Sequence, residues 1–433
     1  MVMNKRRADS DTISRLIVVV LVLLAFAWRI QGLSRQSLWR DEIDTIRFAL
    51  NDLPALLSMF TVPGDNGTLY FLLLRPWLRL TGSSELALRY PSVLFGVLSV
   101  PLFWQVGRRL IPTREIQPAA GAENKSKSGS WRRYPHTFAQ FFFGSSALLA
   151  TIFLVFNPYQ LWYSQEGRMY ALATLLALLA VWLWLEGIGR GGWRFWLGYL
   201  LTITAALFVH RLTILLIPLG FLWFILSWPQ SKGHWKGYFL ALAGLTLPYP
   251  PIAWWQQDLL LSSGQWTGLD FIPFPQLLES ILVYQNQGIS PQVNTIGLVP
   301  VFFLGLFGLL FGFKVIFPGI ADPLANLSAF RRYLLIVGWY LLPPVALYIV
   351  SLRQPLFLPR YLIWIAPAAL MLMALGVQFF WQRNNQFYRS LAVSLALYVI
   401  VFWLLTGWQA KSQDIKTDLR GAISYVSQHR QAG

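Results

Sequence analysis

Residues 15–45 read RLIVVVLVLLAFAWRIQGLSRQSLWRDEIDT, and this stretch decides the fold class. The apolar run Leu16–Ile30 follows four basic residues, and no small-residue cleavage site comes after it. It therefore predicts a retained membrane helix rather than a signal peptide. Because basic residues favour the cytoplasmic side, we expect a cytoplasmic N-terminus, with the acidic segment Asp41–Asp44 emerging on the opposite side of the membrane.

The composition of the whole chain agrees with a membrane protein. Of the 433 residues, 56% are hydrophobic and 12% are charged, whereas soluble domains carry about 25% charged residues. The sequence has no cysteine, which excludes disulfides and thiolate metal sites, and its four histidines leave little room for a multi-histidine metal centre. The net charge of +17 is dispersed between apolar runs, which favours a topology signal over nucleic-acid binding.

Apolar runs close to the roughly 20 residues that cross a bilayer recur along the chain. They predict an all-α polytopic membrane protein with about eleven transmembrane helices. After Leu16–Ile30, the runs are 90–106, 137–158, 170–188, 196–209, 212–228, 237–254, 295–317, 333–351, 361–381 and 390–408. The segment 68–82 carries Arg75, Pro76 and Arg79, so we expect a helix that lies along the outer interface instead of a further span.

The distribution of charge supports this topology. The segments assigned to the inside hold 20 of the 35 Lys and Arg residues but six of the 18 Asp and Glu residues. This imbalance follows the positive-inside rule and leaves most acidic residues outside, which is where we look for chemistry. We divide the chain into a membrane domain, 1–409, with a first external loop at 31–89, and a short external tail, 410–433.

The first external loop carries three carboxylates within one helical turn, those of Asp41, Glu42 and Asp44. Like charges this close together raise one another's pKa, and partial burial raises it further, which can tune a carboxylate as a general base. The alternative interpretation is a solvated acidic helix start with a capping function.

Further charged residues lie at the outer boundaries of other spans. Glu166 and Arg168 stand between two spans, where ionisable groups face a cavity or a partner, or form an interfacial pair. Arg89 and Arg360 each open a span beside a proline. Arginine binds phosphate bidentately, although a lone interfacial arginine also snorkels to the headgroups. His210 lies at another such boundary, as a structural histidine or a substrate contact.

Several nucleotide and metal motifs are absent from the sequence. It contains no P-loop, no Rossmann glycine pattern and no HExxH. A bond-forming reaction outside the membrane would therefore need an activated, lipid-borne donor.

Four segments of the sequence, in this order, resemble a known family. They are WRDEIDT, DNGTLYFLLLRPWLRLTGSSELALRYPSVLFGVLSVPLFWQVGRRL, NPYQLWYSQEGRMYALATLLALLA and LFLPRYLIWIAPAALMLMALG. Together they resemble the GT-C glycosyltransferases, specifically the bacterial relatives of protein O-mannosyltransferases and of the aminoarabinose transferase of lipid A. The resemblance extends from Leu16 to about Tyr425.

The resemblance implies a GT-C fold and a polyprenyl-phosphate-sugar-dependent hexosyl- or pentosyltransferase that inverts the anomeric centre. The acceptor would be a glycolipid, an envelope polysaccharide or a protein hydroxyl, and no nucleic acid would be involved. The enzyme would lie in a bacterial plasma membrane with its active site on the external face.

The resemblance also implies roles for the outer carboxylates. Asp41 matches the general base that removes the proton of the acceptor hydroxyl, with Glu42 or Asp44 orienting it. Glu166 matches an acidic residue that contacts the acceptor or sugar. Asp41, Glu42 and Glu166 would be the ligands of Mg²⁺ or Mn²⁺ if the enzyme uses a metal ion.

Among the basic residues, Arg360 matches a late-span arginine suited to the donor phosphate, and Arg89 matches an arginine before the second span. Arg168, Tyr70 and His210 are further candidates for substrate binding.

The sequence departs from the family at two places. Relatives commonly carry His-Pro-Pro or Lys-Pro-Pro before Leu-Tyr, whereas this chain has Asp65–Thr68, and many relatives continue into a soluble domain beyond Tyr425. Two alternatives to the enzyme stay open: a lipid-linked-sugar flippase or transporter, and a catalytically inactive GT-C relative. The lack of a visible internal repeat and the gathering of charge at one face favour the enzyme.

Overall fold

The structure is a computed structural model that describes residues 2–62, 65–111, 143–245, 247, 249–255, 257, 268–289, 293–316, 323–383 and 385–429. Every regular element within these ranges is a helix. Before residue 228 the helices are α1 (Val2–Ile30), α2 (Arg40–Leu50), α3 (Leu53–Ser58), α4 (Thr68–Thr81), α5 (Glu85–Leu110), α7 (Ser146–Phe156), α8 (Pro158–Ser164), α9 (Tyr170–Arg190), α10 (Trp193–Val209), η2 (Arg211–Leu215) and α11 (Leu216–Leu226). They continue with α12 (Trp228–Ser231), η3 (Lys232–His234), α13 (Trp235–Gly244), α14 (Tyr249–Trp255), α16 (Phe274–Gln287), α17 (Thr295–Ile316), α18 (Pro323–Ser351), η4 (Pro359–Ile365), α19 (Ala366–Trp381), α20 (Gln386–Ser412) and α21 (Leu419–His429).

The polytopic all-α prediction is confirmed. Seven described helices are long and apolar enough to cross a membrane: Asp11–Ile30, Glu85–Leu110, Tyr170–Arg190, Thr295–Ile316, Ser328–Ser351, Pro359–Trp381 and Gln386–Ser412. Three shorter apolar helices accompany them, Ser146–Phe156, Trp193–Val209 and Arg211–Leu226. Each of the eleven predicted runs contains a helix in its described part. The runs 137–158, 237–254 and 295–317 are described only in part.

The helix α19, together with η4 before it, forms the centre of the bundle. In the most apolar window of Pro359–Trp381, 89% of the residues are buried, against 22% for the window in α1. The backbones of α17 and α19 meet directly, because a Cβ on Gly308 would lie 1.7 Å from the carbonyl oxygen of Leu372. In a bilayer the hydrophobic effect does not draw helices together, because lipid tails are as apolar as the side chains. Small residues at a crossing let two helices approach closely and gain van der Waals contact instead.

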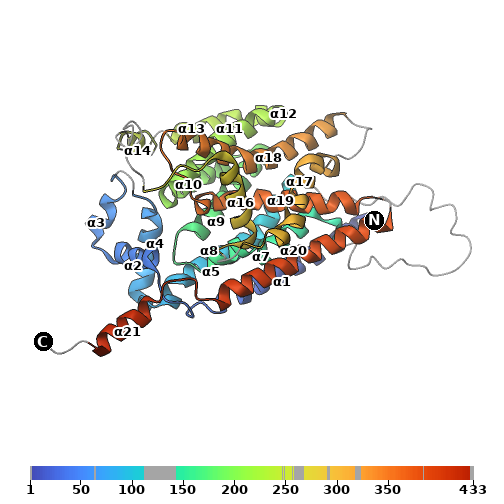
Figure 1. Cartoon of the computed structure of the whole chain (residues 1–433). Coiled ribbons are helices and arrows are strands. Elements are labelled where there is room, and N and C mark those ends of the chain that lie inside the picture. Colours follow the sequence, from blue (N-terminus) through green and yellow to red (C-terminus); the bar gives the residue numbers. More distant parts are fainter. Residues whose placement is uncertain are drawn as a thin grey trace, which may run out of the picture.

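The loop elements gather at one end of the bundle. In Figure 1 the N-terminus lies at one end of the long helices, and α2, α3, α4 and α21 lie at the other, which we call the loop end. The helix α5 starts at the loop end and packs against α1, α7 and α9 as it crosses the bundle. The loop end is therefore where the outer segments predicted to carry chemistry come together.

The helix predicted within 68–82 is present as α4 (Thr68–Thr81). It begins after Gly67, whose φ of +89° lies in the left-handed region that glycine tolerates. Its buried side chains include Phe71, Leu74 and Leu78, whereas Leu80 is 85% exposed. This amphipathic pattern is typical of a helix that lies along an interface.

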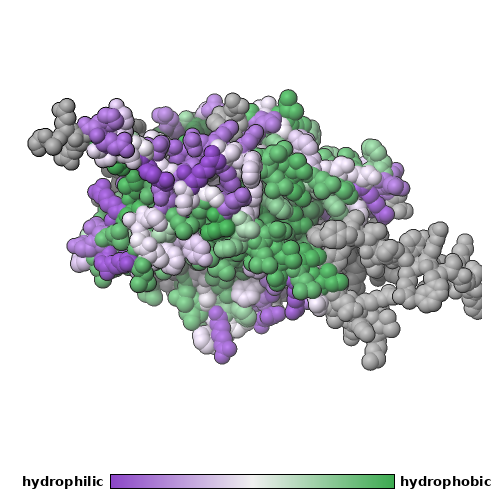
Figure 2. Space-filling view, turned by 90° about the horizontal axis from the view of Figure 1, so that it is seen from below, coloured by the Kyte–Doolittle hydropathy of each residue, from purple (hydrophilic) through white to green (hydrophobic). Residues whose placement is uncertain are grey.

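The surface divides into apolar and polar regions. Viewed from below, the middle of the molecule presents a broad hydrophobic area, and hydrophilic residues gather toward the loop end (Figure 2). The exposed apolar side chains of α1 and α20 include Leu16, Leu23, Leu397 and Leu405, each more than half exposed. A surface of this kind is stable when a bilayer surrounds the helices.

Candidate functional site

The predicted site residues come from six segments of the sequence. These are the start of α2, the start of α4, the start of α5, the turn between α8 and α9, the junction of α10 with η2, and the short helix η4. All six meet at the loop end, where most of the side chains form two groups with different character.

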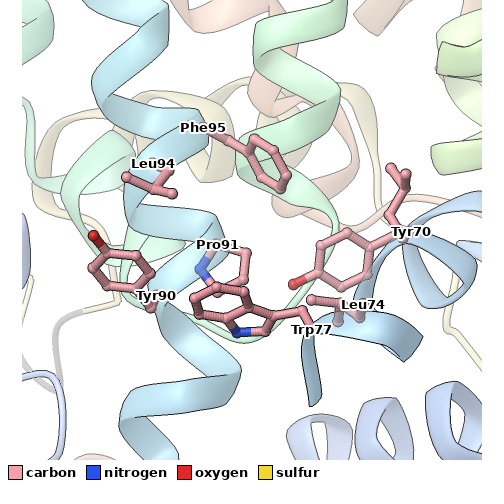
Figure 3. Close-up of a pocket in the computed structure, with 8 residues that line it drawn as sticks. Tyr70, Leu74, Trp77, Tyr90, Pro91, Leu94 and Phe95 are labelled. Carbon is pink, nitrogen blue, oxygen red and sulfur yellow. The ribbon is translucent and has the colours of Figure 1, made fainter. Parts of the chain in front are cut away.

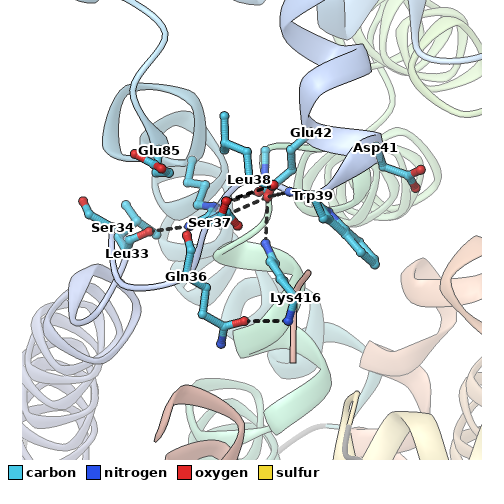
Figure 4. Close-up of polar contacts among 12 residues, drawn as sticks. Leu33, Ser34, Gln36, Ser37, Leu38, Trp39, Asp41, Glu42, Glu85 and Lys416 are labelled. Carbon is cyan, nitrogen blue, oxygen red and sulfur yellow. Dashed lines mark hydrogen bonds and ion pairs between the residues drawn. The ribbon is translucent and has the colours of Figure 1, made fainter. Parts of the chain in front are cut away.

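The first group surrounds Glu42, whose side chain is fully buried. Arg89 donates bidentately to it, from Nε to Oε1 at 2.8 Å and from Nη2 to Oε2 at 2.7 Å. The backbone N–H of Gly167 donates to Oε1 at 2.9 Å. Lys416 Nζ donates to Oε2 at 2.9 Å, as Figure 4 shows. We call Glu42, Arg89, Gly167 and Lys416 the Glu42 cluster.

The donors of Arg89 are all used inside this cluster. Besides Glu42, it donates to the backbone carbonyls of Leu33, Gln36 and Ser37, at 2.7, 2.8 and 3.0 Å. A guanidinium has five N–H donors, so none is left over for a ligand. Burial alone would raise the pKa of Glu42, but Arg89 and Lys416 outweigh it and hold the pKa below its usual value.

Lys416 is a member of the cluster that the sequence analysis missed. It is 9% exposed, and its ammonium lies 5.5 Å from the ring centre of Trp39 and 5.6 Å from that of Trp162. Its backbone N–H donates to Gln36 Oε1 at 3.1 Å. The residue comes from the segment between α20 and α21, so nothing in the local sequence pairs it with Glu42, 374 positions earlier.

The second group surrounds Asp41, which points away from the Glu42–Lys416 contact (Figure 4). Its side chain is 29% exposed and forms an ion pair with Arg360, at 3.3 Å between Oδ2 and Nη1. Arg168 Nη1 donates to the backbone carbonyl of Asp41 at 3.2 Å and to Thr45 Oγ1 at 3.3 Å. Two arginines therefore flank a carboxylate that solvent can reach.

Both arginines retain unused donors. Among the described residues, the buried Nε atoms of Arg168 and Arg360 have no hydrogen-bond partner. The guanidinium of Arg360 also lies 5.9 Å from the ring centre of Tyr170. Buried donors without partners are rare in folded proteins, and they are expected where a ligand supplies the acceptor.

Glu166 adds an unsatisfied carboxylate to this group. Its side chain is fully buried, and neither oxygen has a hydrogen-bond partner in the described part of the chain. Burial raises its pKa to about 7, and the positive charges of Lys416, Arg168 and Arg360 offset this rise only in part. The group is therefore poised to change its protonation near neutral pH.

His210 lies beside the same arginines. Its ring is buried, and its centre lies 5.9 Å from the ring centre of Tyr170 and 5.2 Å from that of Tyr361. Neither ring nitrogen has a hydrogen-bond partner within the described ranges. Burial, followed by repulsion from Arg168 and Arg360, lowers its pKa to about 3. The imidazole is thus neutral at physiological pH. We call Asp41, Glu166, Arg168, Arg360 and His210 the Asp41 cluster.

Tyr70 stands at the edge of both groups. Its hydroxyl lies 3.3 Å from Ser92 Oγ, which in turn donates to the backbone carbonyl of Arg168 at 3.3 Å. The ring also lines a cavity of about 150 Å³ between α4 and α5, where it faces Pro91 and Phe95 (Figure 3). The lining of this cavity is almost entirely apolar.

The segment that departs from the family, Asp65–Thr68, lies against Arg211. The side chain of Asn66 accepts from the Arg211 backbone N–H at 3.1 Å. Burial raises the pKa of Asp65, and the charge of Arg211 counters that rise. A cation therefore stands beside the acidic residue that the sequence analysis singled out as a departure from the family.

Arg29 is a second residue that the sequence analysis missed. It is 1% exposed and donates to Ser164 Oγ and to the carbonyls of Leu154 and Val155, each at 3.2 Å. An arginine at the end of an apolar run is the only sequence signal for this position.

The predicted metal ligands Asp41, Glu42 and Glu166 are not arranged around a common point. Within the described ranges, no group of three or more His, Asp or Glu residues is placed to hold a metal ion. Both oxygens of Glu42 already accept from Arg89, Gly167 and Lys416. Glu42 therefore does not fit the role of a ligand shared with Asp41 and Glu166.

The sequence matches no protein-family model and no curated protein sequence, but solved structures match the fold. ArnT from Cupriavidus metallidurans in the apo state aligns with a TM-score of 0.56 and 14% identity, over 92% of this chain and 76% of that one. The same protein bound to undecaprenyl phosphate aligns with a TM-score of 0.50 and 14% identity, over 95% and 79% of the two chains.

AglB from Archaeoglobus fulgidus, an archaeal oligosaccharyltransferase solved with an inhibitory peptide and a dolichol-phosphate, also matches. Its TM-score is 0.55 at 12% identity, over 96% of this chain and 58% of AglB, so this chain spans less than two thirds of AglB's length. ArnT, an aminoarabinose transferase, and AglB are GT-C fold glycosyltransferases. The chain has the GT-C fold, as the resemblance predicted.

Proposed function

We propose that this protein is a membrane glycosyltransferase that moves a sugar from a polyprenyl-phosphate carrier to an acceptor hydroxyl at the loop end. The observation that carries the proposal is the Asp41 cluster, where a solvent-accessible carboxylate stands beside two arginines with unused donors. The likeness to two lipid-linked-sugar transferases of the same fold supports it. So do the lipid phosphates bound in the structures of those neighbours.

In the proposed reaction, Asp41 is the general base. Its carboxylate removes the proton of the acceptor hydroxyl as that oxygen attacks C1 of the sugar. The new O–C1 bond forms while the bond from C1 to the phosphate oxygen breaks, and the electron pair leaves with the polyprenyl phosphate. Because the attack is a single displacement, the configuration at C1 inverts. A positioned base of this kind contributes about 10²–10⁴-fold to the rate.

The arginines stabilise the leaving group. Negative charge grows on the polyprenyl phosphate as the bond to C1 breaks, and Arg360 and Arg168 each present an Nε donor that has no partner among the described residues. Such donors stabilise the transition state more than the ground state. Arg360 also pairs with Asp41, so one residue connects the base to the phosphate subsite.

The Glu42 cluster takes a positioning role in this proposal. Arg89 and Lys416 neutralise Glu42, and their contacts hold the loop 33–37 and the start of α2 in place. Asp41 is the next residue along, so its orientation depends on this arrangement. Glu42 and Arg89 therefore act through Asp41, while Glu166 and His210 contact the sugar or the acceptor.

The membrane and the orientation of the proposed enzyme are those predicted from the sequence. The enzyme lies in a bacterial plasma membrane with its N-terminus in the cytoplasm and the loop end outside, in accord with the charge imbalance. The donor is a polyprenyl-phosphate hexose or pentose, and the acceptor is a glycolipid, an envelope polysaccharide or a protein hydroxyl. No step of the proposed reaction passes through a metal ion.

The experiment is a transfer assay with purified protein, radiolabelled polyprenyl-phosphate hexoses and pentoses, and a crude envelope-lipid extract as acceptor. We expect label to move with the wild type and not with Asp41→Asn. The control variant is Asp44→Asn, which removes a neighbouring carboxylate of the same helix and should retain transfer. Absence of transfer from every donor by folded wild type would contradict the proposal, and lipid flipping in liposomes would then be measured.

A further inference from the structure

A second charged site lies at the far end of the bundle from the Asp41 cluster. It is a groove of about 520 Å³ between α1, α5 and α9, and its charged lining residues are Arg15, Arg109, Glu186 and Arg190. Arg89 at the loop end and Arg109 in the groove are both in α5, 20 residues apart, which corresponds to about 30 Å along a helix. That distance equals the thickness of the hydrocarbon core, so the groove lies at the opposite membrane interface.

The charges of the groove are organised around Glu186. This carboxylate is 2% exposed and pairs with both Arg109 and Arg190, with 3.2 Å between Arg190 Nε and Glu186 Oε2. Arg109 also donates to the carbonyl of Gln105 at 3.2 Å and lies over the ring of Trp182. One buried carboxylate thus fixes two arginines at the wall of the groove.

The described residues around the groove carry an excess of positive charge. Asp11 pairs with Arg15 and with Arg108, each at 2.8 Å. In the part of the chain that the structure describes, these ion pairs therefore join four arginines, Arg15, Arg108, Arg109 and Arg190, to two carboxylates, which leaves two positive charges in excess. Arg15 and Arg190 are the accessible members, because their side chains are 69% and 70% exposed.

The rest of the lining is apolar and aromatic. Val18 follows Arg15 in α1, and Leu98 and Leu102 precede Arg109 in α5, so these apolar residues line the groove nearer the middle of the bundle. Leu98 is more than half exposed, and Trp104 and Trp182 also line the groove. Tryptophan is typical of the membrane interface, where one side of the ring contacts lipid and the other contacts water. An ideal occupant carries a negative headgroup joined to a hydrocarbon chain.

We propose that this groove binds an anionic phospholipid of the leaflet opposite the Asp41 cluster, with Arg15 and Arg190 contacting the phosphate and an acyl chain lying along Val18, Leu98 and Leu102. Basic pockets between helices at this depth bind anionic headgroups. A bound lipid would join the ends of α1, α5 and α9, the helices whose other ends support the proposed site. The binding does not depend on the proposed glycosyl transfer.

The test compares lipid binding by native mass spectrometry of the full chain in detergent. Phosphatidylglycerol and phosphatidylcholine with identical acyl chains are the probes. The variant is Arg15→Gln/Arg190→Gln, which keeps the buried Arg109–Glu186 pair. The matched control is Arg383→Gln/Arg389→Gln. It removes two exposed arginines where α19 ends and α20 begins, which is also the end of the bundle away from the Asp41 cluster.

We expect the wild type to prefer phosphatidylglycerol, and the groove variant to bind it about tenfold or more weakly, with phosphatidylcholine binding unchanged. The control variant should keep the wild-type preference. Equal losses in both double variants would overturn the proposal, since they would reflect only the overall positive charge. Competition by inorganic phosphate as effective as that by phosphatidylglycerol would overturn it as well, because the site would then recognise a free anion rather than a lipid.

Discussion

The neighbouring residues Asp41 and Glu42 belong to two clusters with opposite properties. In the Glu42 cluster, every donor of Arg89 and both oxygens of Glu42 have partners within the protein. In the Asp41 cluster, Glu166, His210 and both arginines have buried polar atoms that lack partners among the described residues. A polar network that satisfies itself maintains the architecture, whereas one that leaves buried groups unsatisfied is expected where a ligand binds.

The comparison explains why the two carboxylates of the Asp-Glu pair are not equivalent. In the helix α2, consecutive side chains point about 100° apart around the axis. Glu42 therefore faces α5 and the 416 segment, while Asp41 faces η4 and solvent. A sequence motif of two adjacent acids thus combines one structural and one accessible carboxylate.

The largest effect should come from Asp41→Asn. The amide keeps the shape of the side chain but cannot accept the proton, so we expect kcat/KM to fall about 10²–10⁴-fold. The unfolding midpoint in detergent should stay near that of the wild type, because the side chain is partly exposed. Retention of full activity would remove Asp41 as the base and would end the proposed distinction between the two clusters.

The next effect is on stability and tests the other cluster. Arg89→Leu leaves Glu42 buried with Lys416 as its remaining cationic partner, so we expect a loss of about 3–5 kcal/mol in the free energy of unfolding. Denaturant titration in detergent measures it. The control is Arg79→Leu, which removes an arginine from the exposed face of α4. Wild-type stability of Arg89→Leu would show that the Glu42 cluster does not hold the loop.

Arg360→Ala sharpens the comparison by separating donor from acceptor. If Arg360 stabilises the leaving phosphate, kcat/KM for the donor should fall about 10²–10³-fold, the cost of removing one transition-state donor. The KM for the acceptor should change little. Steady-state kinetics with each substrate varied in turn distinguishes the two, and an unchanged donor kcat/KM would refute the phosphate role.

The raised pKa of Glu166 predicts a pH dependence of stability. A carboxyl with a folded pKa of about 7 binds its proton more tightly in the folded than in the unfolded chain. Folding is therefore favoured at low pH and weakened as pH rises from about 4.5 to 7, with a change of about 3 kcal/mol. Relative to Glu166→Gln, the wild type should lose stability over this window and then level off. If the difference in the free energy of unfolding between the two proteins did not change with pH, the raised pKa of Glu166 would be contradicted.

The smallest effect concerns metal ions. Because both oxygens of Glu42 already have protein donors, we expect chelation with EDTA to change transfer by less than about twofold. A strict requirement for Mg²⁺ or Mn²⁺ in the same assay would mean that the Glu42 cluster opens during turnover, and the distinction between closed and open clusters would have to be revised.

The sequence alone predicted the membrane helices and the segments that carry the candidate site. Apolar runs and basic flanks depend on local composition, and a bilayer selects them in every chain that contains them. Glu166, Arg168 and Arg360 were predicted as site residues because each is charged and lies at the end of an apolar run, and Asp41 because it is one of three carboxylates within one helical turn. Both are local signals, and the resemblance to the GT-C glycosyltransferases pointed to the same residues.

Only the tertiary structure decided which of these charges are paired and which are unsatisfied. The contact of Lys416 with Glu42 joins residues 374 positions apart, and the pairing of Arg89 with Glu42 joins residues 47 apart. The same holds for Arg109 and Arg190, which Glu186 brings together from two helices. Partners of this kind depend on how helices pack and turn against one another, and no single stretch of sequence contains that information.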